Sequence, residues 1–148
     1  MAITHNETST GLINDLPALT KFVKRYDKLC LVDGVSSMDG TEVTVDTWGI
    51  DIMFSSSQKC FGVPPGIGIG SVSERSLDVS AGMPDKGWDF DLIVWEKNHA
   101  AGKGTPMTST IPQVAGLNAA LRMIDEMGGV SRRTLTCTRG GTQQSGTD

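Results

Sequence analysis

Two short strand-like runs, each followed by a polar loop, constrain the fold of this chain more than any other feature. The first is the apolar run Leu29–Asp33, which Asp33 ends, and the second is Ile50–Phe54, which leads into a turn of three serines. A continuous apolar run such as the first is typical of a strand that is covered on both faces. We therefore expect both runs to be strands of a sheet that lies between helices.

Helical patterns alternate with these runs. Residues 15–27 are predicted to form an amphipathic helix, because Asp15 can cap it and Pro17 suits its first turn. Its apolar stripe is expected to comprise Leu16, Leu19, Phe22, Val23 and Tyr26. The remaining expected elements are a strand at 67–72 and helices at 73–80, 88–96 and 111–127. This alternation predicts an α/β fold with a mostly parallel sheet flanked by helices.

Composition and charge argue against several classes of protein. The chain has 148 residues, a net charge of -4 and no basic stripe, which argues against a nucleic-acid partner. Its longest apolar stretches are too short to span a membrane, and its N-terminus lacks the pattern of a signal peptide. Because the three cysteines lack metal-ligand spacing and fit reduced thiols, we expect a cytoplasmic location, with an organelle left open. Neither His5 nor His99 has an acidic or cysteine partner at ligand spacing, so both are expected to be structural and no metal site is predicted.

Residues 131–148 differ from the rest of the chain. They contain five threonines, three arginines and three glycines, and show neither helical nor strand periodicity. We expect one domain at residues 1–130, followed by an atypical tail at 131–148 that is either disordered or out-of-frame sequence.

Lys59 and Asp33 each stand at or just beyond the carboxyl end of an expected strand. A lysine in a turn is ordinarily a solvated surface charge, and an aspartate after a strand is ordinarily a turn or cap residue. Together they offer an amine for a Schiff base and a carboxylate for a pyridinium nitrogen, which are the two groups that a pyridoxal 5'-phosphate (PLP) site needs. A partly desolvated pocket is expected to keep the Lys59 amine nucleophilic, and Val35 is expected to pack under the ring.

Three threonines precede the helix predicted at 111–127. Thr105, Thr108 and Thr110 offer hydroxyls near a helix N-terminus, a place that suits an anionic phosphate. Capping of the helix explains the same residues equally well, so both interpretations stay open.

Five ordered motifs together resemble a known family. They are THNETSTG at 4–11, VDGVSS at 32–37, WGID at 48–51, SQK at 57–59 with PPG at 64–66, and TPMT at 105–108. Their order and spacing over residues 3–130 are similar to those of the class V PLP-dependent aminotransferases, and within them to the alanine–glyoxylate and serine–glyoxylate (or serine–pyruvate) group. The resemblance implies that residues 1–130 form part of the large domain of a type I PLP-transferase fold.

The resemblance also implies a role for each matching position. Lys59 would form the Schiff base with PLP and move the substrate α-proton, Asp33 would hold the pyridinium nitrogen, and Val35 would lie against the ring. Thr8 would bond near the ring hydroxyl or the phosphate, and Gln58 would bind the phosphate.

Further roles concern a second subunit. In the family, the segment that matches 105–108 reaches across a dimer interface, which implies a homodimer in which Thr105 and Thr108 bind the neighbouring subunit's phosphate. Many members have a tyrosine where Thr105 stands. Members are also much longer, with an N-terminal phosphate loop and a C-terminal small domain that grips the substrate carboxylate, so we expect this chain by itself to be inactive.

The reaction that the resemblance implies is amino transfer from alanine or serine to glyoxylate or pyruvate, with small amino acids and 2-oxo acids as substrates. Two alternatives stay open. One is a catalytically inactive α/β remnant that binds an anion or a partner protein. The other is the chemistry of a class V lyase or desulfurase, although desulfurases usually have a histidine where Gln58 stands and need a mobile cysteine, whereas Cys60 lies in a structured turn.

Overall fold

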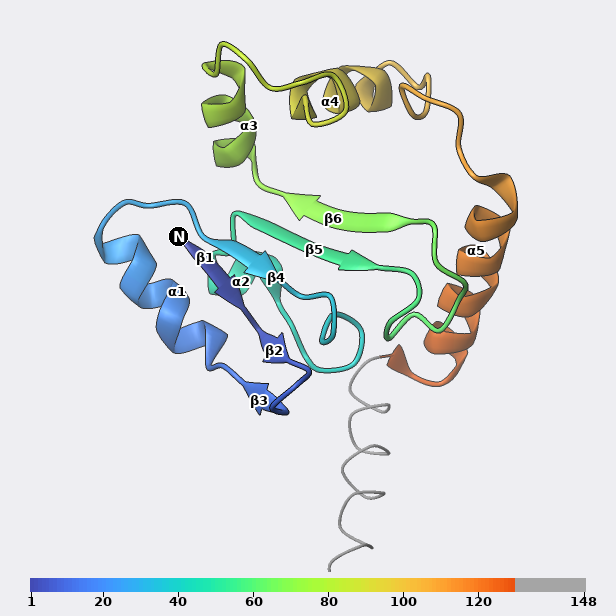
Figure 1. Ribbon diagram of the computed structural model, residues 1–148, viewed down its shortest axis with the longest axis horizontal. Coiled ribbons are helices and arrows are strands. Elements are labelled where there is room, and N and C mark those ends of the chain that lie inside the picture. The colour runs from blue at the N-terminus through green and yellow to red at the C-terminus, as the bar shows by residue number, and fades with distance from the viewer. Residues whose placement is uncertain (130–148) are drawn as a thin grey trace, which may run out of the picture.

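A four-stranded sheet forms the centre of the protein. The computed structural model describes residues 1–129, and Figure 1 shows the arrangement of their helices and strands. The strand order is β1-β4-β5-β6. The bounds are Ala2–Thr4 for β1, Leu31–Asp33 for β4, Ile52–Ser56 for β5 and Gly68–Val72 for β6. Because β1, β4 and β5 are parallel and only β6 runs antiparallel to its neighbour, the prediction of a mostly parallel sheet is confirmed.

Helices flank this sheet, and a small hairpin follows β1. The helices are α1 (Leu16–Arg25), α2 (Val45–Trp48), α3 (Glu74–Ala81), α4 (Leu92–Ala100) and α5 (Ile111–Glu126), and the hairpin pairs β2 (Asn6–Glu7) with β3 (Leu12–Ile13). α1 and α5 lie on opposite sides of the molecule, and α3 and α4 lie beyond β6 (Figure 1). The α/β arrangement expected from the alternating patterns is therefore present.

The hydrophobic core lies between α1 and the first three strands of the sheet. Leu16 and Val23 of α1 pack with Ile3 of β1, Val32 of β4 and Met53 of β5, and Val32 and Met53 are fully buried. Side chains of α2 add to the edge of this core. In α5, by contrast, Ile124 is the one buried residue. The packing therefore fixes the strands β1, β4 and β5 most firmly, and these are the strands that carry the predicted site.

An ion pair with a buried carboxylate closes the core at the start of β5. Asp51 is buried, and its carboxylate lies 2.7 Å from the Lys24 ammonium of α1 and accepts the Cys30 N–H at 2.7 Å. Burial by itself raises the pKa of Asp51, but the hydrogen bonds from Lys24 and the Cys30 N–H outweigh it and lower that pKa from its ordinary value. The network joins α1 to the beginnings of β4 and β5.

Most elements agree with the sequence patterns, and the differences have physical reasons. The helix expected at 88–96 begins at Leu92 instead, because the Asp91 carboxylate caps it by accepting the Ile93 N–H at 3.0 Å. Two members of the expected α1 stripe, Phe22 and Tyr26, are exposed and contact each other at the surface. The tail expected at 131–148 lies outside the described residues.

Candidate active site

The parallel strands bring most of the predicted residues to one edge of the sheet. Within the register, Thr4 of β1 pairs with Asp33 of β4, which in turn pairs with Phe54 of β5. The chain leaves all three strands at this carboxyl edge, through the β2–β3 hairpin and the loops at 34–40 and 57–66. Thr8 lies in the turn of that hairpin and Val35, Gln58 and Lys59 lie in the two loops, and ligand sites in open α/β sheets lie at this edge.

Asp33 lies at the centre of this edge, half-buried, with a carboxylate held in place by its own loop. Its Oδ1 accepts the Val35 N–H at 2.9 Å, which fixes the direction of the side chain. Its backbone C=O accepts the His5 N–H at 2.9 Å from the neighbouring strand end. Among residues 1–129 no lysine, arginine or histidine forms an ion pair with this carboxylate. A half-buried carboxylate without a cationic partner is suited to receive one from a ligand.

Gly34 allows the loop after Asp33 to lie close against β5. A Cβ added to Gly34 would lie 2.2 Å from Cε of Met53 and 3.3 Å from the backbone oxygen of Phe54. Met53 is fully buried, so a side chain at position 34 would have to displace the end of this core methionine. The Gly34 N–H donates to the Phe54 oxygen at 2.9 Å, so the loop that carries Val35 is fixed to the strand that leads to Lys59.

Thr8 reaches the same loop from the first strand end. The Thr8 and Ser36 hydroxyls are 2.5 Å apart, so one donates to the other. Thr8 is exposed and Val35 is half-buried. The structure therefore places Thr8 against the loop that carries Val35 and follows Asp33.

Lys59 stands on a turn that hydrogen bonds hold rigidly. Ser57 is fully buried; its hydroxyl donates to the Pro64 C=O at 2.9 Å and accepts the Ile67 N–H at 3.3 Å. The side chains of Gln58 and Lys59 are exposed on this turn. The expected position of Lys59 at the carboxyl end of a strand is present, but the described residues do not form the partly desolvated pocket that we expected around its amine.

Thr105 and Thr108 lie in the segment before α5 and are exposed. The Thr105 hydroxyl donates to the Met107 C=O at 2.6 Å and pairs with the Ser109 hydroxyl at 2.8 Å. Both threonines line a cavity of about 350 Å³ that also includes Gly66, at the far end of the Lys59 turn. Neither Lys59 nor Asp33 lines this cavity, so these two threonines form a group apart from Thr8, Asp33 and Val35.

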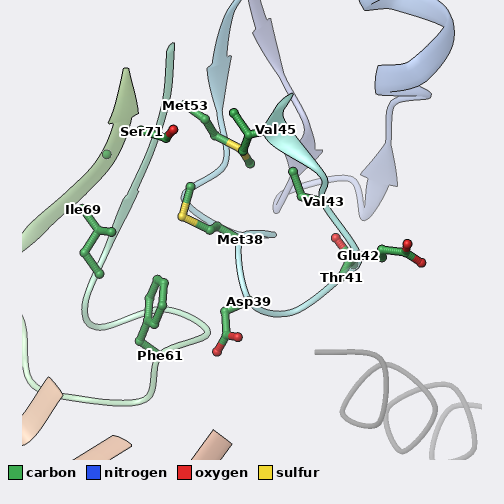
Figure 2. Close-up of a pocket in the computed structure, with 11 residues that line it drawn as sticks. Met38, Asp39, Thr41, Glu42, Val43, Val45, Met53, Phe61, Ile69 and Ser71 are labelled. Atoms are coloured by element: carbon green, nitrogen blue, oxygen red, sulfur yellow. The ribbon is translucent and has the colours of Figure 1, made fainter. Parts of the chain in front are cut away.

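A second cavity, of about 380 Å³, lies between the loop after β4 and the strands β5 and β6 (Figure 2). Its lining is mainly apolar and includes Met38, Met53, Phe61 and Ile69, while the carboxylate of Asp39 stands at its margin in Figure 2. Lys59 and Asp33 do not line it. An apolar lining of this kind does not suit a phosphate, so the cavity is not the anion site that the sequence predicts.

The available side chains fit the groups of PLP. The unpaired Asp33 carboxylate suits a protonated pyridine nitrogen, and the exposed Lys59 amine suits an aldehyde. In addition, the Ser56 hydroxyl at the end of β5 is buried and has no hydrogen-bond partner in the described part of the chain. Buried hydroxyls are normally bonded, so an unpaired one beside the Lys59 turn is available to a polar ligand. No group of metal-ligating side chains occurs among residues 1–129.

A buried pair at this edge was not foreseen from the sequence. The Nδ1 atom of His5 lies 2.8 Å from the Ser37 hydroxyl, and both residues are buried. Burial lowers the pKa of His5 from its ordinary value, so the ring is neutral at neutral pH. The sequence did not indicate this pair because β1, which places His5 at the edge, has only three residues and is too short to show a strand pattern.

Comparison with known proteins points to one family. The family described as aminotransferase class-V matches residues 1–134. An uncharacterized aminotransferase of Methanocaldococcus jannaschii is 38% identical over 99% of this chain and 40% of its own length. The serine–glyoxylate aminotransferase of Arabidopsis thaliana is 36% identical over 86% of this chain and 32% of its own length.

A solved structure gives the same result. The alanine–glyoxylate aminotransferase of Nostoc sp. superposes with a TM-score of 0.83 and 29% identity, over 90% of this chain and 36% of that chain. The chain thus spans two fifths or less of the length of each of these relatives. No helix among the described residues is long and apolar enough to cross a membrane. The match over residues 1–134, together with the shared fold, shows that this chain belongs to the class V aminotransferases.

Proposed function

We propose that this chain is part of a PLP-dependent aminotransferase that transfers an amino group from alanine or serine to glyoxylate or pyruvate. The observation that carries the proposal is the placement of Asp33 and Lys59 at the carboxyl ends of the adjacent parallel strands β4 and β5. The names of the serine–glyoxylate and alanine–glyoxylate relatives support the choice of substrates.

Asp33 would hold the pyridine nitrogen in its protonated state. The ion pair would satisfy a carboxylate that has no cationic partner among residues 1–129, and the Val35 N–H keeps the carboxylate in one orientation. When bound, PLP supplies an electron sink for the charge that remains when a proton leaves the α-carbon of an amino acid. Val35 would lie against one face of the ring.

Lys59 would carry protons during the reaction. Its Nζ would take the proton from the α-carbon of the amino acid and return a proton to the carbon on the far side of the amino nitrogen, which is general base and general acid catalysis by one group. Its turn is suited to this work, because the buried Ser57 fixes the backbone while the side chain stays free to move. Thr8 would bond near the ring hydroxyl or the phosphate of the cofactor, and Gln58 would bind the phosphate.

Thr105 and Thr108 would act in a homodimer. They line a cavity apart from Asp33, and we propose that they bind the phosphate at the site of a second subunit. Hydroxyl groups close to the N-terminus of α5 are suited to bind the negative charge of the phosphate.

Cys60 argues against a desulfurase. Its thiol donates to the Ser36 C=O at 3.5 Å and is half-buried, so it is held against the 34–40 loop. A desulfurase needs a cysteine that moves to its substrate. Cys30, the other cysteine among residues 1–129, lies in the core, where burial raises its pKa.

The test is to incubate the chain with PLP, reduce it with borohydride and locate the modified lysines by peptide mapping. We expect the pyridoxyl group to collect on Lys59 in preference to the exposed lysines Lys21, Lys28 and Lys97. A Lys59→Arg variant keeps the charge and should lose the preferred label. Labelling spread evenly over exposed lysines in the unmodified chain would refute the proposal and leave a non-catalytic remnant of the family.

A further inference from the structure

His5 lies directly behind the proposed cofactor-binding edge. It is the first residue after β1, its side chain is 4% exposed, and its Nδ1 is 2.8 Å from the hydroxyl of Ser37, which is 1% exposed. The ring also meets Trp48 of α2 edge-on, with centroids 6.5 Å apart and planes at 83°. The imidazole thus contacts the Trp48 ring and bonds to the Ser37 hydroxyl.

His5 contacts both parts of the Asp33 loop. Its backbone N–H donates to the Asp33 C=O at 2.9 Å, while its ring bonds to Ser37, three residues beyond Gly34. Between these two contacts the chain forms a tight turn, in which the Ser37 N–H donates to the Gly34 C=O at 3.0 Å. Val35 lies inside this turn, and its N–H orients the Asp33 carboxylate. A shift of Ser37 would therefore move Val35, whose N–H orients the Asp33 carboxylate.

Removing either member of the bond between His5 and Ser37 costs free energy of folding. Both side chains are buried, so neither group can exchange its partner for bulk water when the other is removed. Burial lowers the pKa of His5 and so keeps the ring neutral. A neutral imidazole has one donor nitrogen and one acceptor nitrogen, and the nitrogen that bonds to Ser37 is Nδ1. A buried hydrogen bond of this type fixes the distance between the end of β1 and the 34–40 loop.

We propose that His5 is a positioning residue: its bond to Ser37 fixes the 34–40 loop and thereby the direction of the Asp33 carboxylate and the position of Val35. This inference rests on the proposed function, because it assigns His5 to the support of the site for PLP. His5 touches neither substrate nor cofactor in this assignment and acts through Asp33 and Val35.

Two substitutions separate the hydrogen bond from the shape of the ring. His5→Phe keeps a ring against Trp48 and removes the bond to Ser37. His5→Asn loses the ring but places an amide close to the position of Nδ1, so it can restore the bond. Ser37→Ala removes the same bond from the other side, together with the longer bond from the Ser37 hydroxyl to the Gly34 C=O at 3.5 Å. Ser76→Ala is the matched control, because its buried hydroxyl donates to the Asp51 C=O at 3.2 Å, at the opposite edge of the sheet.

The measurement is the preference of the PLP label for Lys59 over Lys21, together with the thermal midpoint of the PLP-free chain. We expect His5→Phe and Ser37→Ala each to lower the preference about five- to tenfold, which is the range that the loss of one buried hydrogen bond produces. Combining the two should lower it little further, since both remove the bond between His5 and Ser37. His5→Asn should stay within about twofold of the unmodified chain, and Ser76→Ala should lower the midpoint while leaving the preference unchanged.

The other outcomes are distinguishable. A selective label on Lys59 in the unmodified chain that persists in His5→Phe would refute the role of His5 and leave the proposed function standing. An equal loss in Ser76→Ala would show a general effect of stability and would also refute it. Absence of any selectivity in the unmodified chain would overturn the proposed function and this inference with it.

Discussion

At the residue scale, the charge of Asp33 is separable from its structural role. In Asp33→Asn the amide oxygen can still accept the Val35 N–H, so the loop should keep its shape while the negative charge is lost. A hydrogen bond to a charged group contributes about 1.5–3 kcal/mol, so we expect PLP to bind about tenfold more weakly or worse. An absorbance titration measures this, and a thermal midpoint checks the fold. Equal affinity for PLP in the two proteins would contradict the proposed role.

His5 also makes a prediction about pH. Burial lowers its pKa from the ordinary value of 6.5, so below that pH the unfolded chain binds more protons at this position than the folded chain does. The free energy of unfolding should therefore fall as the pH falls below 6.5, and no such loss should occur above it. Urea unfolding at a series of pH values should show a smaller loss in His5→Asn than in the unmodified chain.

The matched control for that series is His99→Asn, because His99 is exposed. This variant should show the same dependence on pH as the unmodified chain. If His5→Asn and His99→Asn behave alike, the buried imidazole does not contribute to the acid sensitivity of the fold.

The positions of Asp33 and Lys59 on the sheet follow from the sequence more directly than their surroundings do. Both are visible because each stands at or after the carboxyl end of a strand-like run, and the parallel sheet then brings them to one edge. The bond between His5 and Ser37 joins residues far apart in the sequence, so only the pairing of β1 with β4 reveals it. The exposure of Lys59 could likewise not be predicted, because the sequence of a turn does not indicate which other residues cover its side chains.

At the element scale, capping residues determine where the helices begin. The Asp15 carboxylate accepts the Ala18 N–H at 3.0 Å at the start of α1, and Leu16 and Val23 of that helix lie in the core. Asp15→Ala should lower the free energy of unfolding by about 1 kcal/mol, as measured with urea. Lys21→Ala, on the exposed face of the same helix, should change it by less than about 0.5 kcal/mol. Equal effects of the two changes would show that the cap is dispensable.

Caps and apolar runs also explain which elements the sequence predicts. α1, α3 and α5 each have a clear start and enough turns to show periodicity, and all three were foreseen within one or two residues of their bounds. β1 and α2 have three and four residues, which is too short for either period to appear. Their places are set by tertiary contacts, since β1 pairs with β4 and α2 packs on the core.

At the scale of the whole molecule, the packing is uneven. The core joins α1 to β1, β4 and β5, whereas α5 contributes a single buried residue. Three apolar residues along one side of α5 are exposed: Ile111 by 74%, Val114 by 48% and Leu121 by 46%. Apolar surface of this kind is stabilised by burial at about 25 cal/mol per Å², and a second copy of the chain offers the same surface. We therefore expect the chain to self-associate through α5.

Sedimentation over a range of protein concentrations tests this expectation with two variants of equal charge. Leu121→Glu places a carboxylate within the apolar side of α5 and should weaken association about tenfold or more, because burying one leucine contributes about 1.5–3 kcal/mol. Ala119→Glu adds the same charge on the other side of the helix, where the side chain is also exposed, and should leave association unchanged. If both variants weaken association equally, net charge rather than the α5 surface controls it. A chain that stays monomeric at every concentration would show that these side chains are tolerated in water.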